Sequence, residues 1–243
     1  MDIPRNIRDG EEFSLDELKK YLSENNISAE NLSLKQFPSG YSNLTYFLQS
    51  SSKQFVLRRP PFGAKSLQGG HDMLREYNVL KNLKSQFSKV PDVFLYCDNN
   101  EILGAPFYLM ERVEGYIIRP NLQQKDSPGS DIIQNVSKSL VSTLVELHNV
   151  NIEKANLKDL GNINGYVKRQ VEGWIKRYNH SKTDNISNMD FISSWLYENQ
   201  PSEVGSSIVH NDSKYDNLVL DKDDFSKISA VLDWEMATIG DPF

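Results

Sequence analysis

Cysteine is almost missing from this sequence, since Cys97 is the only one among 243 residues. A disulfide needs two cysteines, so none can form within the chain, and a reducing compartment is the simpler expectation. Cys97 directly follows Phe94, Leu95 and Tyr96. We interpret it as a small buried hydrophobic residue, the common state of a free cysteine, and not as a reactive thiol.

Long hydrophobic runs and an excess of basic residues are missing too. No stretch approaches the roughly 20 apolar residues of a membrane-spanning helix, and no apolar run after the N-terminus suggests a signal peptide. We therefore predict a cytoplasmic protein without a membrane span. The net charge of −6 argues against a nucleic-acid surface, which needs clustered basic residues. It does not exclude a nucleotide, which a few cations and a metal ion can hold.

The first 112 residues predict a β-rich lobe. A capping box of Ser14 and Glu17 begins an amphipathic helix over 14–25. Runs rich in aromatic and branched residues then predict five strands, with one helix between the third and the fourth. The strands are expected at 34–36, 45–48, 55–58, 93–97 and 102–112, and the helix at 73–84.

From residue 113 the pattern becomes mostly helical. Apolar residues recur at helical spacing over 131–148, 166–178 and 191–197. Two short apolar segments, 218–220 and 228–232, predict a β-hairpin with polar residues at its ends. We therefore predict an α+β protein with two lobes, 1–112 and 113–243.

The ends of this hairpin carry the residues with the most informative chemistry. His210, Asp212 and Asn217 form a His-x-Asp-x-x-x-x-Asn motif before its first strand, and Asp233 follows its second strand. Phosphoryl transfer from a Mg-nucleotide to a hydroxyl needs a carboxylate to accept the proton, and an amide oxygen and a second carboxylate to hold metal. The plainer alternative is two surface loops rich in Asp and Asn. The motif is expected by chance in roughly one such chain in a hundred, so it needs partners elsewhere.

One partner is the segment between the first two predicted strands. Gly40, Ser42 and Asn43 are small or polar, so the backbone N–H groups of this loop can approach phosphate oxygens closely. Taken alone, the segment is better interpreted as an ordinary hairpin loop.

With these segments in order, the chain from about residue 32 onward resembles the aminoglycoside phosphotransferase and choline kinase family, which has a protein-kinase-like fold. Within that family it is most similar to the phosphotransferase domains associated with acyl-CoA dehydrogenases. The resemblance rests on 37–46, 55–59, 75–77, 107–115, 147–148, 169–171, 209–220 and 231–242.

The resemblance implies a role for each candidate residue. Asp212 would be the catalytic base, His210 would brace its loop, and Asn217 and Asp233 would bind Mg²⁺. The nucleotide, ATP or alternatively GTP, would lie under the loop of Gly40, Ser42 and Asn43. Its base would lie beside Met110, Glu111 and Val113, and its phosphates near Arg58, the expected ion-pair partner of Glu76. The acceptor would be a hydroxyl of a small molecule, with a hydroxyacyl-CoA-like compound, an aminoglycoside, choline or a sugar as alternatives.

Two departures from the family pattern bear on this interpretation. Arg58 stands where the family usually has a lysine, and an arginine is longer, planar and forked. The dehydrogenase-associated domains are expected to share it, so we do not interpret it as a loss of activity. The family's domain also continues past the equivalent of Asp241 and Pro242 with helices that complete the acceptor pocket. We expect those helices to be absent, and apolar surface near Trp174 and Trp195 to be exposed as a result.

Two other functions stay open at this stage. A nucleotide-binding, pseudokinase-like module or an inactive fragment is favoured by Arg58 and by the early end of the chain. A protein kinase is less favoured, since 210–212 and 233–235 depart from its usual signatures and no Ala-Pro-Glu segment follows.

Overall fold

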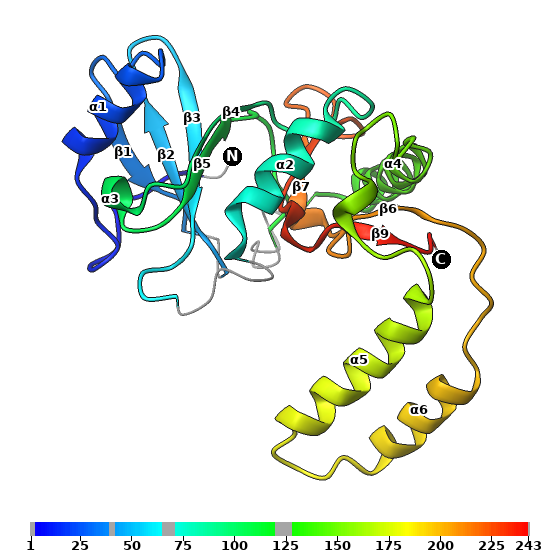
Figure 1. Ribbon diagram of the computed structural model, residues 1–243. Coiled ribbons are helices and arrows are strands. Elements are labelled where there is room, and N and C mark those ends of the chain that lie inside the picture. The colour runs from blue at the N-terminus through cyan, green and yellow to red at the C-terminus, as the bar shows by residue number, and fades with distance from the viewer. Residues whose placement is uncertain (1–2, 39–41, 65–70, 120–127, 243) are drawn as a thin grey trace.

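The computed structural model describes residues 3–38, 42–64, 71–119 and 128–242. Figure 1 shows a β-rich lobe on one side, a lobe with helices and short strand pairs on the other, and a helical hairpin that projects from the second lobe. The described part of the chain contains no helix with the length and hydropathy needed to cross a bilayer.

The first lobe is built on a five-stranded antiparallel sheet with the strand order β1-β2-β3-β5-β4. This confirms the predicted strand count and the position of the inserted helix. The elements are α1 (Leu15–Glu24), β1 (Ser33–Gln36), β2 (Leu44–Gln49), β3 (Gln54–Arg59), α2 (Met73–Leu83), β4 (Val93–Cys97), α3 (Asn100–Leu103) and β5 (Phe107–Glu111).

One boundary in this lobe was predicted wrongly. The segment expected to be one strand over 102–112 begins with a helical turn, α3, and only then becomes β5. The Asn99 side chain accepts a hydrogen bond from the Glu101 amide at the start of this turn, and Gly104 ends it with φ 77°. An asparagine cap and a left-handed glycine stop outweigh the strand propensity of the single residue Ile102.

The two faces of the sheet contribute to different cores. Leu18 and Leu22 of α1 are fully buried against one face, together with strand residues such as Tyr46 and Leu57. The opposite face packs on α2, and that core continues into the second lobe through Leu218 and Trp234. The two lobes therefore share one hydrophobic core behind the space between them.

The second lobe combines helices with two small strand pairs. Its β7–β8 hairpin was predicted, whereas the β6–β9 pair was not. The elements are α4 (Ser130–His148), the 3-10 helix η3 (Lys158–Leu160), α5 (Tyr166–Ser181), α6 (Ser187–Glu198), β6 (Ser207–Val209), the 3-10 helix η4 (Tyr215–Asn217), β7 (Leu218–Leu220), β8 (Ile228–Val231), the 3-10 helix η5 (Trp234–Met236) and β9 (Thr238–Gly240).

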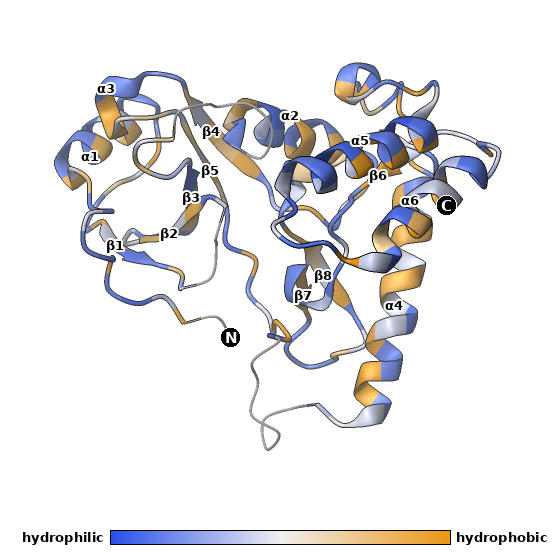
Figure 2. Ribbon diagram, turned by 90° about the horizontal axis from the view of Figure 1, so that it is seen from below, coloured by the Kyte–Doolittle hydropathy of each residue, from blue (hydrophilic) through white to orange (hydrophobic). Residues whose placement is uncertain are grey.

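The helices of this lobe differ in how much of their surface is covered. Val136 and Leu147 of α4 are buried, but α5 and α6 have no buried residue. Figure 2 shows hydrophobic residues along α4, α5 and α6. Much of the apolar surface of these helices is therefore in contact with solvent, as the sequence predicted for the region around Trp174 and Trp195.

Candidate functional site

A cavity of about 380 Å³ lies between the two lobes. Its walls come from β3, the end of β5, the segment after β5, the loop between β6 and β7, and the segment after β8. Most of the residues predicted for the site line it: Ser42, Asn43, Arg58, Met110, Glu111, Val113, Asp212, Asn217 and Asp233. His210 and Glu76 are buried directly behind it. Gly40 lies outside the described residues.

The β7–β8 hairpin brings the two candidate metal ligands together. Leu218 pairs with Val231, and the Leu232 amide donates to the Asn217 carbonyl at 2.8 Å. Asn217, directly before β7, and Asp233, two residues after β8, therefore flank the open end of the hairpin. Asp233 adopts a left-handed conformation with φ 68°, which Asp tolerates better than most residues.

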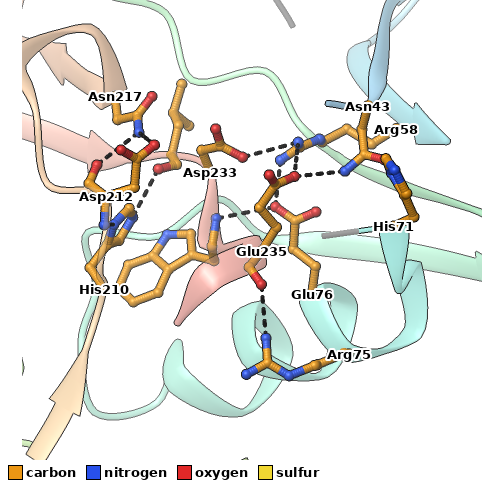
Figure 3. Close-up of polar contacts among 12 residues, drawn as sticks. Asn43, Arg58, His71, Arg75, Glu76, His210, Asp212, Asn217, Asp233 and Glu235 are labelled. Atoms are coloured by element: carbon orange, nitrogen blue, oxygen red, sulfur yellow. Dashed lines mark hydrogen bonds and ion pairs between the residues drawn. The ribbon is translucent and has the colours of Figure 1, made fainter. Parts of the chain in front are cut away.

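Asp212 is held in place by two neighbours in its own loop, Asn217, which Figure 3 shows, and Lys214. The Asn217 Nδ2 donates to the Asp212 carbonyl at 2.9 Å and to its Oδ2 at 3.0 Å. Lys214 Nζ lies 2.9 Å from the same Oδ2, and this contact raises the pKa of Lys214. Because Nδ2 of Asn217 faces Asp212, its side-chain oxygen is the atom that remains for a cation.

His210 supports the Asp212 loop from behind. Its Nδ1 accepts from the Asp212 amide at 3.2 Å, so this nitrogen must be unprotonated, and Nε2 donates to the Leu232 carbonyl at 3.0 Å. Burial lowers the pKa of His210, which favours this neutral form. The ring also packs edge-on against Trp234 with centroids 4.7 Å apart. The geometry supports the predicted bracing role, since both ring nitrogens are engaged.

Arg58 lies at the centre of a group of three carboxylates. Its Nη1 is hydrogen bonded to Glu76, its predicted partner, and its Nη2 lies 3.0 Å from Asp233 Oδ1 and 3.4 Å from Glu235 Oε2. Burial raises the pKa of Glu76 to about 7, Asp233 and Glu235 add to the rise, and Arg58 opposes it. Glu76 Oε1 also accepts from the Trp234 amide at 3.2 Å.

Two residues that sequence reasoning missed complete this region. Glu235 Oε2 accepts from Asn43 Nδ2 at 2.7 Å, and Asn43 Oδ1 lies 3.0 Å from His71 Nδ1 (Figure 3). Arg75 of α2 donates to three backbone carbonyls, those of Glu235, Ala237 and Leu160. The available signal was proximity in sequence, because Glu235 is two residues from Asp233 and Arg75 adjoins Glu76.

The side of the cavity that the sequence predicted to hold the base is more apolar. Met110 is buried in β5, opposite Val56 of β3, and Val113 lies in the segment that joins the lobes. Further along that segment, Tyr116 exchanges two backbone hydrogen bonds with Leu220 of β7. An aromatic base can enter between such apolar walls and reach the backbone of Glu111 and Val113.

No cluster of three or more His, Cys, Asp or Glu side chains suited to a metal ion is present among the described residues. The pair of Asn217 and Asp233 nevertheless fits Mg²⁺. This ion prefers oxygen ligands and commonly uses one or two from the protein, with phosphates and water completing its shell.

Comparisons with known proteins agree with this geometry. The model of the family described as "Phosphotransferase enzyme family" matches residues 33–243. The chain is 42% identical over 212 residues to acyl-CoA dehydrogenase family member 11 of Rattus norvegicus. This alignment covers 87% of this chain and 27% of that protein. The chain therefore spans about a quarter of the length of this relative.

Solved structures share the fold. A putative aminoglycoside phosphotransferase from Ralstonia eutropha superposes with a TM-score of 0.80 at 30% identity, over 95% of this chain and 67% of that chain. APH(2")-IIIa in complex with GDP and kanamycin superposes with a TM-score of 0.69 at 17% identity, over 94% and 75%. These neighbours confirm the predicted α+β, kinase-like fold with its five-stranded sheet and helical second lobe.

Proposed function

Because the chain belongs to the phosphotransferase enzyme family, we propose that it transfers the γ-phosphoryl group of ATP to a hydroxyl group of a small molecule. The observation that carries the proposal is that Asp212, Asn217 and Asp233 line one cavity together with the segment that joins the lobes. Under this proposal a proton acceptor, two metal ligands and a base-binding wall would surround the same space.

Asp212 is proposed as the catalytic base. Its Oδ2 is held by Asn217 and Lys214, whereas Oδ1 has no hydrogen bond to the part of the chain that the structure describes. An acceptor hydroxyl can therefore donate to Oδ1, which orients its oxygen for attack. Oδ1 takes the proton as the new oxygen–phosphorus bond forms and the bond from the γ-phosphorus to the bridging oxygen breaks, so that ADP leaves.

Asn217 and Asp233 are proposed to hold Mg²⁺. When bound, the ion supplies positive charge that neutralises the phosphate oxygens. Met110, Glu111 and Val113 are proposed to hold the purine, and Arg58, supported by Glu76, to contact the phosphates. Gly40, Ser42 and Asn43 are proposed to cover the phosphates. GTP is the alternative donor, since APH(2")-IIIa was solved with GDP.

The acceptor is proposed to be a small hydroxylated compound. A hydroxyacyl-CoA is the first acceptor to assay, because the curated relative is an acyl-CoA dehydrogenase family member. Kanamycin is the second, because it is present in the complex of APH(2")-IIIa. Both follow from similarity and not from residues of this chain.

The test of this proposal is the Asp212→Ala variant. We expect Mg-dependent phosphate transfer to fall by about 10²–10⁴-fold, the usual contribution of a general base. The stabilisation of the protein by MgATP in a thermal-shift titration should be retained. Asp184→Ala, an exposed position in the loop between α5 and α6, is the matched control and should keep full activity.

A nucleotide-binding module without catalysis is the second candidate, favoured by the three carboxylates that already occupy Arg58. It predicts stabilisation by MgATP, less by ATP with a chelator, and no transfer to any acceptor in the unsubstituted protein. Undiminished transfer by Asp212→Ala would instead rule out the proposed mechanism.

A further inference from the structure

Glu235 has no role in the proposed function, yet its carboxylate lies beside residues that have one. It lies on η5, its side chain is 11% exposed, and it faces two residues of the first lobe. One is Arg58 of β3, at 3.4 Å from Nη2, and the other is Asn43, at 2.7 Å through Nδ2. Glu235 therefore joins the second lobe both to β3, through Arg58, and to Asn43, the residue directly before β2.

The position of Glu235 is explained by the two terminal nitrogens of the Arg58 guanidinium group. A lysine at position 58 has one nitrogen, which Glu76 and a phosphate oxygen can share. Arg58 brings a second terminal nitrogen, Nη2, and this atom needs a fixed acceptor of its own in a largely buried place. Among the described residues, Asp233 and Glu235 are the acceptors that Nη2 contacts.

Asp233 cannot pair equally strongly with Nη2 and with a metal ion, because the two cations share one carboxylate. Under the proposed function, a divalent cation binds Asp233 and competes with Arg58 for the same carboxylate. Glu235 then remains as the acceptor that anchors Nη2. The cluster also holds more carboxylate than guanidinium charge, so an incoming cation improves its charge balance.

We propose that Glu235 is a positioning residue for Mg-nucleotide, which acts through Arg58 and Asn43 and adapts the site to an arginine in place of a lysine. The inference rests on the proposed function, because it presumes that the cavity binds Mg-nucleotide. Glu235 holds Nη2 when Asp233 binds the metal ion, and it holds the Asn43 side chain at the wall of the cavity.

The test is the variant Glu235→Gln, measured by calorimetric titration with MgATP and by thermal shift. Glutamine keeps the size and an oxygen for Asn43 but removes the charge that anchors Arg58. We expect the Kd for MgATP to rise about tenfold, the effect of losing one charge-assisted hydrogen bond. We expect the melting temperature without nucleotide to be unchanged or higher, since a repulsion with Asp233 is removed.

A second pair of variants isolates the role of the fork. In an Arg58→Lys background the Nη2 atom is gone, so adding Glu235→Gln should raise the Kd by less than about threefold. Glu146→Gln is the control, because it removes the same charge from an exposed carboxylate that pairs with Lys89 at 2.6 Å. It should leave the Kd for MgATP unchanged.

The outcomes separate the inference from the proposed function. If Glu235→Gln and the unsubstituted protein have equal Kd values for MgATP, the inference alone is wrong. It is also wrong if Glu235→Gln raises the Kd by the same factor in the Arg58→Lys background as in the unsubstituted protein. A lower melting temperature with an unchanged Kd assigns Glu235 a structural role only. No stabilisation of the unsubstituted protein by MgATP overturns the proposed function and the inference together.

Discussion

At the scale of single residues, His210 shows how a side chain can fix a loop that lines the cavity without lining the cavity itself. Both of its ring nitrogens are used, one by the Asp212 amide and one by the Leu232 carbonyl. Only the neutral ring can make both bonds, because a protonated Nδ1 cannot accept one. The brace between the two site-bearing loops therefore depends on the protonation of one buried group.

This arrangement predicts a pH dependence of stability. Burial lowers the pKa of His210 in the folded state, so below about pH 6.5 the unfolded chain binds a proton that the folded chain does not. Stability is then lost as the pH falls, at up to about 1.4 kcal/mol per pH unit until the folded pKa is reached. The neighbouring charges of Asp212, Asp233 and Lys214 modulate this slope.

Denaturant unfolding between pH 7 and pH 5 checks the prediction. The variant His210→Gln keeps a nitrogen near the Leu232 carbonyl but cannot titrate, so its free energy of unfolding should change less over this range. His180→Gln, at an exposed position of α5, should retain the original slope. A slope for His210→Gln equal to that of the unsubstituted protein would contradict the argument.

The residues that could be predicted from sequence are those fixed by a local motif. Asp212, Asn217 and Asp233 have a set spacing around a hairpin, and the structure brings them to one cavity. Glu235 and Lys214 have no such signature, because an acidic or basic residue in a polar loop is ordinary. Their contacts with Arg58 and Asp212 become visible only when the loops are folded.

At the scale of elements, the segment after β5 is attached to the β7–β8 hairpin. Tyr116 and Leu220 exchange two backbone hydrogen bonds of 2.9 Å and 2.8 Å. Gly115 lies directly against the same strand, where an added Cβ would come 2.2 Å from the Leu220 carbonyl oxygen and 2.5 Å from Val219. The absence of a side chain at this position is what allows such a close approach.

The variant Gly115→Ala is therefore expected to push this segment away from β7. We expect a loss of about 1–3 kcal/mol in the free energy of unfolding, the usual cost of overpacking. The Kd for MgATP should also rise, because Val113 and Asn217 lie on the two separated segments. Gly205→Ala is the matched control, since an added Cβ there meets nothing within 4 Å. Equal unfolding energies for the two variants would exclude this packing constraint.

The helices and strands that the sequence predicted correctly are those whose signals lie within a few neighbouring residues. The capping box of Ser14 predicted α1, and runs rich in aromatic and branched residues predicted β2 and β3. The β6–β9 pair joins segments about 30 residues apart, and each strand is three residues long. So short a strand has no readable periodicity, and its partner is set by the tertiary fold.

At the scale of the whole molecule, the apolar surface of the second lobe is large. Trp174, Phe191 and Trp195 of α5 and α6 are 59%, 71% and 52% exposed, and Val141 and Val145 of α4 are 62% and 53% exposed. Soluble monomers rarely expose contiguous apolar patches of this kind. We expect this surface to drive association of the chain as its concentration rises.

Sedimentation velocity and binding of a hydrophobic dye check this expectation. The double variant Phe191→Glu, Trp195→Lys should sediment as a smaller species at equal concentration and bind less dye. Its stabilisation by MgATP should persist, because neither residue lines the cavity. Ile3→Ser, at an exposed position of the first lobe, should change neither sedimentation nor dye binding. Identical sedimentation of the double variant and the unsubstituted protein would assign association to another surface.

The overall architecture was predictable because it depends on the order of many elements and not on any one boundary. Misplacing the start of β5 by a few residues left the count of five strands correct. The shared core behind the cavity was not predictable, since it joins Val56 and Met110 to Leu218 and Trp234 over distances that no local pattern records.

The contacts of Arg75 have a consequence for how the sequence of this protein can vary among its orthologues. Its side chain connects α2 to backbone carbonyls of η3, of η5 and of the residue after η5, at positions 160, 235 and 237. Every amino acid supplies a carbonyl, so these hydrogen bonds place no demand on which side chains occupy the three positions. As far as these bonds are concerned, selection can hold the arginine fixed while the residues that accept from it change. In a set of orthologous sequences, this inter-lobe contact would then leave one invariant residue and no covarying partner.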